Sequence, residues 1–389
     1  LMSFFAWVDF DQADRDRTRR IMDLFDQKDS RDELGLGSVR DALSDLLFPG
    51  TSTIQTRLRY MLFVPWIYRM AGATVGTSSA RQDKARAYEI RLIDALVRGG
   101  ETINVIGSEA RDTLKRLPSD VYWAGMLTFG IRRFQGSRTA CLELAPGEAD
   151  ALWAAGIPDA PVGFLENGSK IDFTLRPEEA DFIRDRLAQK APDSLLTWLS
   201  RQNDAAECNM IWEHPQSSEW PKDIKVLVDH AERFSNLMHG ASLLYNLMLS
   251  ERAAQMQATE ESVWHDRIEY YTSRLSKWAS DTPFETFEAW DLNDLWDQSR
   301  RTIHSVKPQT KRFVEDWRLA VANSKGYVAK DISARSLVRD REQRLKGLKS
   351  RFRNDGALTR WGGASGITPL GYRWQPVVMN HVRDLTRDK

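Results

Sequence analysis

The feature that most constrains this chain is a long helical periodicity near its middle. In residues 224–256, IKVLVDHAERFSNLMHGASLLYNLMLSERAAQM, apolar side chains recur at spacings of three and four, which places them along one face of an α-helix. Similar patterns predict further helices over 38–48, 84–100, 108–117, 119–134, 176–189, 262–278 and 334–355. Alternating runs are few, and KIDFTL (170–175) is the one typical of a strand. The expected class is therefore mainly α, a multi-domain helical protein with few short strands.

The charge is divided unevenly along the chain, and this division suggests three segments. We expect an N-terminal helical domain (1–140), an acidic helical middle domain (141–299) that begins with a Pro- and Gly-rich linker (141–168), and a basic C-terminal helical region (300–389). The net charge is zero, yet the middle carries 13 basic and 29 acidic side chains, and the last segment carries 21 basic and 8 acidic ones. A basic end region suggests a polyanionic partner. Docking of that region on the acidic middle of the same chain is an equal alternative.

Cysteine usage and the motif content limit the compartment and the chemistry. Cys141 and Cys208 cannot build a disulfide framework, and no apolar run approaches the ~18 residues of a membrane span, so we expect a cytoplasmic protein without membrane contact or signal peptide. The sequence contains no P-loop, no H-E-x-x-H run and no G-x-S-x-G motif, and its six histidines are scattered. We therefore expect no cofactor, no metal site and no catalytic site of its own.

Two arginines lie within an apolar run in residues 46–68, LLFPGTSTIQTRLRYMLFVPWIY. If this run is a helix, Arg57 points into its apolar face. Because an unpaired buried charge is very costly, Arg57 then needs a partner, and the preceding helix offers Asp41 or Asp45.

The second arginine of that run is interpreted differently. In a helix capped by Ser52 or Thr53, Arg59 lies opposite the apolar face, where it is open to solvent or to an anion. Pro65 should bend or end the helix near Val64, because its ring removes a backbone donor.

Three stretches carry a resemblance to known sequences: RDELGLGSVRDALSDLLFPGTSTIQTRLRYMLFVPW (31–66), FSNLMHGASLLYNLML (234–249) and LGYRW (370–374). Through them the chain resembles an uncharacterised bacterial family of unknown function. Members of that family tend to be encoded near helicase and nuclease genes of antiphage defence islands. The resemblance implies a setting in antiviral defence, with helicase or nuclease subunits as partners, but it assigns no catalytic residue.

Residues 107–134 have the length of a helix-turn-helix. A recognition helix must present polar side chains to base edges, whereas VYWAGMLTFGI (121–131) is almost wholly apolar. Base readout from this helix is therefore not expected. Arg132 and Arg133, which follow it, are candidates for phosphate contact in the manner of a wing, so a winged-helix-like shape stays open for the N-terminal part.

An acidic run, FETFEAWDLNDLWD (284–297), repeats a carboxylate at every third residue. In a helix these side chains spread over about 240°, so they cannot all line one metal site. We interpret the run as a solvated acidic surface, with a surface for a basic protein partner or a two-carboxylate ion site as alternatives. His230 and His239 lie near an apolar stripe and are expected to be core histidines.

The basic C-terminal helix is the strongest functional signal. In ARSLVRDREQRLKGLKSRFRND (334–355), five cations form a row about 27 Å long beside an apolar stripe: Arg335, Arg339, Lys346, Lys349 and Arg353. Such a row could follow the phosphates of a nucleic acid, although a solvated helix flank is the common alternative. The helix is followed by three aromatic residues and one cation: Trp361, Tyr372, Arg373 and Trp374. Rings beside cations favour binding to single strands, and the alternative is that these side chains only close the domain.

These observations lead to one expected function and two rivals. We expect a non-catalytic accessory or scaffold subunit of an antiphage defence assembly that contacts the nucleic-acid backbone through the basic helix. The first alternative is a metal-dependent nuclease with dispersed carboxylates, which requires clustered acids in a cleft. The second is a pure protein adaptor, whose basic end binds an acidic partner or the acidic middle of its own chain; a basic helix packed on residues 281–299 would favour it.

Overall fold

A computed structural model describes residues 32–144, 149–202, 205–256 and 261–386. The chain divides into two compact units. Unit 1 comprises the described residues up to Ala42 together with His230–Leu370, and unit 2 comprises Leu43–Asp229 together with the described residues from Gly371. The chain passes between the units within α2 (Gly37–Leu47) and α9 (Lys222–Met256).

The described residues are mainly helical, as the periodicity predicted. They contain no strand, and KIDFTL (170–175) is irregular. An isolated bridge between Arg132 and Trp153 is the β-type pairing found among them. No described helix combines the length and the apolar character that crossing a membrane requires.

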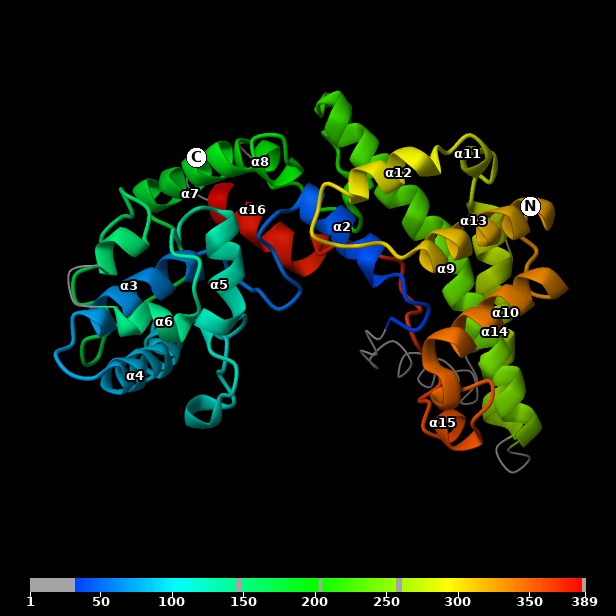
Figure 1. Cartoon of the computed structure of the whole chain (residues 1–389), viewed down its shortest axis with the longest axis horizontal. Coiled ribbons are helices and arrows are strands. Elements are labelled where there is room, and N and C mark those ends of the chain that lie inside the picture. The colour runs from blue at the N-terminus through cyan, green and yellow to red at the C-terminus, as the bar shows by residue number, and fades with distance from the viewer. Residues whose placement is uncertain (1–31, 145–148, 203–204, 257–260, 387–389) are drawn as a thin grey trace, which may run out of the picture. The chain divides into compact units, whose positions relative to one another are not determined.

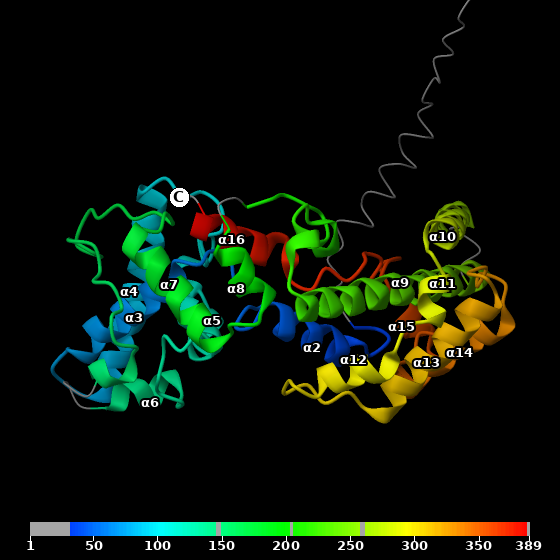
Figure 2. The same ribbon diagram turned by 90° about the horizontal axis from the view of Figure 1, so that it is seen from above.

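Unit 2 is built from short and medium helices. They are α3 (Tyr60–Gly72), α4 (Ser78–Arg98), α5 (Pro118–Thr128), α6 (Arg138–Glu143), α7 (Pro177–Lys190), α8 (Leu195–Ser200) and α16 (Met379–Thr386). Helix α3 packs against α4 and α5, and α16 packs against α7 and α8 (Figures 1 and 2). The rings of Phe63 and Trp66 on α3 meet Phe164 from the long irregular connection that precedes α7. This connection therefore contributes to the core of unit 2.

Unit 1 is organised along the long helix α9. Its other helices are α10 (Glu261–Asp281), α11 (Glu285–Glu288), α12 (Leu292–Ser299), α13 (Pro308–Asn323), α14 (Ile332–Lys346) and α15 (Asp355–Thr359). Two indoles attach neighbours to α9: Trp278 of α10 donates to the Asn236 carbonyl at 2.8 Å, and Trp317 of α13 donates to the Leu237 carbonyl at 2.9 Å. Helix α14 lies against α13 (Figure 1).

The predicted helix that begins near Ser52 is wrong in its bounds. Helix α3 begins only at Tyr60 and continues through Pro65 to Gly72, so the proline does not end it. Most of α3 is buried, and the apolar burial on either side of Pro65 outweighs the missing backbone hydrogen bond.

The helix-turn-helix shape considered for residues 107–134 is not present. The expected first helix is reduced to the 3-10 turn η1 (Arg111–Thr113), and α5 ends at Thr128. Helix α5 begins at Pro118, and the Ser119 amide and hydroxyl in its first turn both donate to the buried Glu89.

Candidate nucleic-acid interface

Helix α14 carries much of the predicted basic surface. It begins after Asp331, whose carboxylate caps the helix by accepting a hydrogen bond from the Ala334 amide at 2.7 Å. Ala334 and Val338 are buried on its inner face. The helix ends before Gly347, which has a φ of +54°, a left-handed conformation that glycine adopts at little cost.

The predicted single helix of this region is wrong beyond Lys346. Lys349 lies in the 3-10 turn η6 (Gly347–Lys349), and Arg353 follows that turn. The part of the predicted cationic row that lies on α14 runs from Arg335 to Lys346 and is therefore limited to about 17 Å. Leu345 and Leu348, which belong to the apolar stripe of the expected helix, are 46% and 90% exposed.

Two of the predicted contact residues are engaged inside unit 1. Arg335 forms an ion pair with Glu251 and donates to the Ala329 carbonyl at 2.6 Å. Lys346 forms an ion pair with the buried Glu33. The charges of these two cations are thus already balanced by carboxylates of their own unit.

The Lys346–Glu33 pair belongs to a buried polar network that sequence reasoning missed. Glu33 pairs with Arg351 at 2.7 Å, and Arg351 also donates to the Tyr245 hydroxyl at 3.1 Å. Glu342 is fully buried and accepts from the Arg351 amide at 2.8 Å. The acids of this network are therefore withdrawn from the surface.

The remaining cations of this segment are exposed. None of the following pairs with a carboxylate of the described residues: Arg339, Arg344, Lys349, Arg353 and Arg360. The acids of the same segment are mostly occupied, because Asp331 caps α14, Glu342 is buried and Asp355 pairs with Arg252 at 2.7 Å. Asp340 alone among them is exposed without such a role. We call the five exposed cations the basic surface of unit 1.

Sequence reasoning identified only part of this basic surface. Arg344 and Arg360 were not predicted, because the helical wheel places Arg344 away from the row and Arg360 lies beyond the expected helix. The positive composition of residues 300–389 was the available signal, but it does not distinguish exposed cations from buried ones.

The aromatic residues that were predicted to stack on bases are buried. Trp361, Tyr372 and Trp374 are 4%, 2% and 1% exposed. Trp361 stacks on Trp264 in unit 1, and the Trp374 indole donates to the Cys208 carbonyl at 3.0 Å in unit 2. The stacking prediction for these rings is therefore wrong, and the alternative that they close the fold describes them.

Two further arginine candidates in unit 2 are engaged in the fold. Arg373 donates to Asp45 at 2.6 Å. Arg132 is 4% exposed, donates to the Trp123 carbonyl at 3.1 Å and lies 4.6 Å from the centroid of the same indole. Arg133 is exposed and stays a candidate for phosphate contact.

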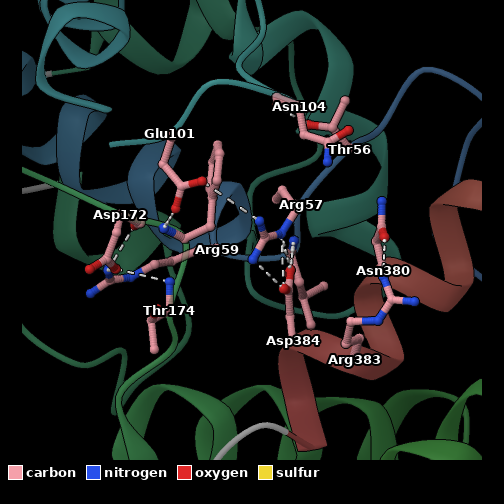
Figure 3. Close-up of polar contacts among 12 residues, drawn as sticks. Thr56, Arg57, Arg59, Glu101, Asn104, Asp172, Thr174, Asn380, Arg383 and Asp384 are labelled. Carbon is pink, nitrogen blue, oxygen red and sulfur yellow. Dashed lines mark hydrogen bonds and ion pairs between the residues drawn. The ribbon is translucent and has the colours of Figure 1, made fainter. Parts of the chain in front are cut away.

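Arg57 is buried and ion-paired, as predicted, but its predicted partners are wrong. Its guanidinium makes a two-atom contact with Asp384 of α16, with Nε at 2.9 Å and Nη2 at 2.6 Å from Oδ1 (Figure 3). The Leu58 amide donates to the same carboxylate at 2.9 Å. Asp41 instead contacts Arg40, and Asp45 contacts Arg373.

The expectation that Arg59 is open to solvent is wrong. Its side chain is 5% exposed, because it donates to both carboxylate oxygens of Glu179 at 2.9 and 3.0 Å and to Asp172 at 3.1 Å. Figure 3 shows Arg59 and Asp172 beside the Arg57–Asp384 pair. With its donors directed at these acids, Arg59 is a structural residue of unit 2.

The acidic run 284–297 supports the fold of unit 1. Asp291 caps α12, and Asp294 contacts the buried His230 at 2.8 Å. The hydrogen bond from His230 lowers the pKa of Asp294. Within the described residues, no group of three or more His, Cys, Asp or Glu side chains is placed to hold a metal ion.

Of the two predicted core histidines, His230 is buried and His239 is half-buried, and His214 and His381 are buried as well. The His239 Nε2–H donates to the Ile367 carbonyl at 3.1 Å, and burial lowers the pKa of His239 to about 4. His381 of α16 is fully buried, and burial, reinforced by the charge of Arg57, lowers its pKa to about 3. Both imidazoles are therefore neutral at physiological pH.

An open groove of about 430 Å³ lies along α4 in unit 2. Its lining mixes acids and arginines: Asp83, Arg86, Arg91, Asp94 and Asp112. Arg86 already donates to the carbonyls of Asp112 and Leu114 at 2.8 and 3.0 Å. The groove therefore presents no dominant charge to a ligand.

Comparison with known proteins assigns the chain to a family. The model of the family of unknown function DUF6361 matches residues 2–386, and the chain belongs to that family. No curated protein and no solved structure matches it. The comparisons therefore confirm that the chain belongs to an uncharacterised family of unknown function.

Proposed function

We propose that this member of the family binds the phosphate backbone of nucleic acid through the basic surface of unit 1. One observation carries the proposal: five cations of residues 339–360 are exposed, while most acids of the same segment are buried or paired. Contacts of this kind go to phosphate and position a protein without reading sequence. Arg133 of unit 2 is the one other predicted contact that is exposed.

The ion pairs of α14 divide its cations between the fold and the surface. Arg335 contacts Glu251 of the acidic middle segment, and Lys346 contacts Glu33, so these two cations are engaged within the chain as the docking alternative expected. The proposal therefore rests on the five exposed cations of the basic surface.

The resemblance supplies the biological part of the proposal. Because members of the resembled family tend to be encoded near helicase and nuclease genes, we place this contact in a non-catalytic accessory or scaffold subunit of an antiphage defence assembly. Helicase or nuclease subunits of that assembly are the proposed protein partners.

A salt titration tests the proposed contact. If four or five cations each neutralise a phosphate, the logarithm of the association constant should fall against the logarithm of salt with a slope of about −4 on duplex DNA and about −3 on single strands. Changing Arg339, Lys349 and Arg353 together to Gln should reduce that slope by about 2 to 3 units. The fold should survive, because all three side chains are exposed.

A matched variant controls for net charge. Changing Lys115, Arg116 and Lys170 together to Gln removes three exposed cations from unit 2 and should leave the slope unchanged. No binding by the wild type at about 50 mM salt, or equal loss in both triple variants, contradicts the proposal. The oligonucleotides should also remain uncut in the presence of Mg²⁺, and cleavage would favour the nuclease alternative.

A further inference from the structure

One aromatic ring stands out on unit 1. Tyr327 lies in the turn between α13 and α14 and is 73% exposed. Among the described residues it is the one Phe, Tyr or Trp side chain that is exposed, since all the others are buried or half-buried. Its neighbours Lys325 and Lys330 are exposed as well.

The turn that carries this ring is held firmly in place. The amides of Gly326 and Tyr327 donate to the carbonyls of Val321 and Ser324 at 2.9 and 3.0 Å. Val328, directly after the ring, is fully buried. The exposure of Tyr327 is therefore a property of a hydrogen-bonded turn that is anchored in the core.

A glycine is required at the base of this turn. Gly326 has a φ of +80°, and a Cβ there would meet the ring of Phe284 at 2.1 Å. The backbone at Gly326 thus lies against the ring of Phe284 with no room for a side chain. This contact fixes the direction of the backbone at the next residue, Tyr327. The fixed backbone of the turn loses little freedom on contact, which suits the exposed ring that it carries to binding a flat partner.

The surroundings of the ring match the chemistry of a nucleic-acid strand. Lys325 and Lys330 flank it in sequence, and Arg339 lies on the same face of α14 as Ile332, seven residues and about 10 Å further along the helix. A ring that offers a stacking face, followed by cations for phosphates, is the arrangement by which proteins bind single strands. A duplex hides its base faces within its own stack.

We propose that Tyr327 is a stacking platform that makes the basic surface of unit 1 prefer single-stranded over double-stranded nucleic acid. This inference rests on the proposed function, because the cations supply most of the affinity. The ring adds an interaction that does not involve counterions, so it changes the affinity without changing the salt slope.

The test compares Tyr327→Ala with Tyr327→Phe in the full chain. The probes are a labelled oligothymidylate of about 20 nucleotides and a duplex of equal length. Tyr327→Ala should weaken oligothymidylate binding about 5- to 150-fold, with a parallel salt dependence, and should change duplex binding less than about twofold. Tyr327→Phe, which keeps the ring, should bind like the wild type.

Ile332→Ala is the matched control for the loss of exposed apolar surface, since Ile332 is 81% exposed beside the same turn. It should change oligothymidylate binding less than about twofold, the same bound as for the duplex. The inference is overturned if Tyr327→Ala leaves oligothymidylate affinity unchanged, weakens both probes equally, or is matched by Ile332→Ala or Tyr327→Phe. If the wild type binds neither probe, the proposed function fails and the inference fails with it. If the basic triple variant loses slope while Tyr327→Ala is silent, only the inference fails.

Discussion

Two groups of arginines, one in each unit, have opposite roles. In unit 2, Arg57, Arg59 and Arg132 are each at most 8% exposed and donate to carboxylates or carbonyls of their own unit. In unit 1, Arg339 and Arg353 are exposed and pair with no carboxylate of the described residues.

This difference shows that the number of cations in a segment does not measure its capacity to bind an anion. A guanidinium whose donors are all directed at protein oxygens offers none to phosphate. What distinguishes residues 331–360 of unit 1 is that most of their acids are buried, paired or used as a cap, which leaves a surplus of positive charge on this part of the surface.

The largest expected effect is at the buried pair of unit 2. Arg57→Ala or Asp384→Ala should each lower the free energy of unfolding by about 3 to 5 kcal/mol, because either change leaves a buried charge without its partner. Urea denaturation of the chain, monitored by tryptophan fluorescence, measures this loss of unfolding free energy.

The double variant serves as the control for that pair. In the double variant neither charge remains, so no unpaired charge is buried. The loss in the free energy of unfolding should therefore be well below the sum of the two single losses. Additive losses would show that the two side chains stabilise unit 2 independently.

A smaller effect is expected at the buried carboxyl of Glu89. Burial raises its pKa from 4.5 to about 7, although hydrogen bonds from Ser119 oppose the shift. The folded state then holds the proton more tightly than the unfolded state, so this group's stabilisation is complete below about pH 4.5 and is lost as the pH rises to about 7. The loss amounts to up to about 3 kcal/mol.

Glu89→Gln should remove this pH dependence, because the amide resembles the protonated carboxyl and does not titrate. Unfolding of the wild type and the variant is compared at several pH values across that window. If the free energies of unfolding of wild type and variant differ by the same amount at every pH, Glu89 does not titrate between about pH 4.5 and 7.

The smallest expected effect is at the basic surface of unit 1. Arg339→Ala should change the free energy of unfolding by less than about 0.5 kcal/mol, because the side chain is exposed. The same variant should reduce the salt slope of DNA binding by about 0.9. A loss of stability comparable to that of Arg57→Ala would abolish the distinction between the two units.

Sequence periodicity predicted the long helices well and the short or irregular segments poorly. The pattern over 224–256 agrees with α9, because a long apolar stripe leaves few alternatives to a helix. The helix expected over 334–355 ends at Lys346, where local glycine chemistry outweighs the continuing pattern of charges. KIDFTL has the composition of a strand but no partner strand among the described residues.

The sequence by itself determined the helical class and the concentration of positive charge toward the C-terminus. Each follows from local spacing or composition. Only the tertiary structure decided that Arg57 pairs with Asp384, that Arg59 is closed off by Glu179, and that Tyr327 is exposed while Trp374 is buried. The physical reason is that an ion pair or a buried ring depends on which distant segments meet. Arg57 and Asp384 are brought together by packing across most of the chain, and no local pattern encodes that contact.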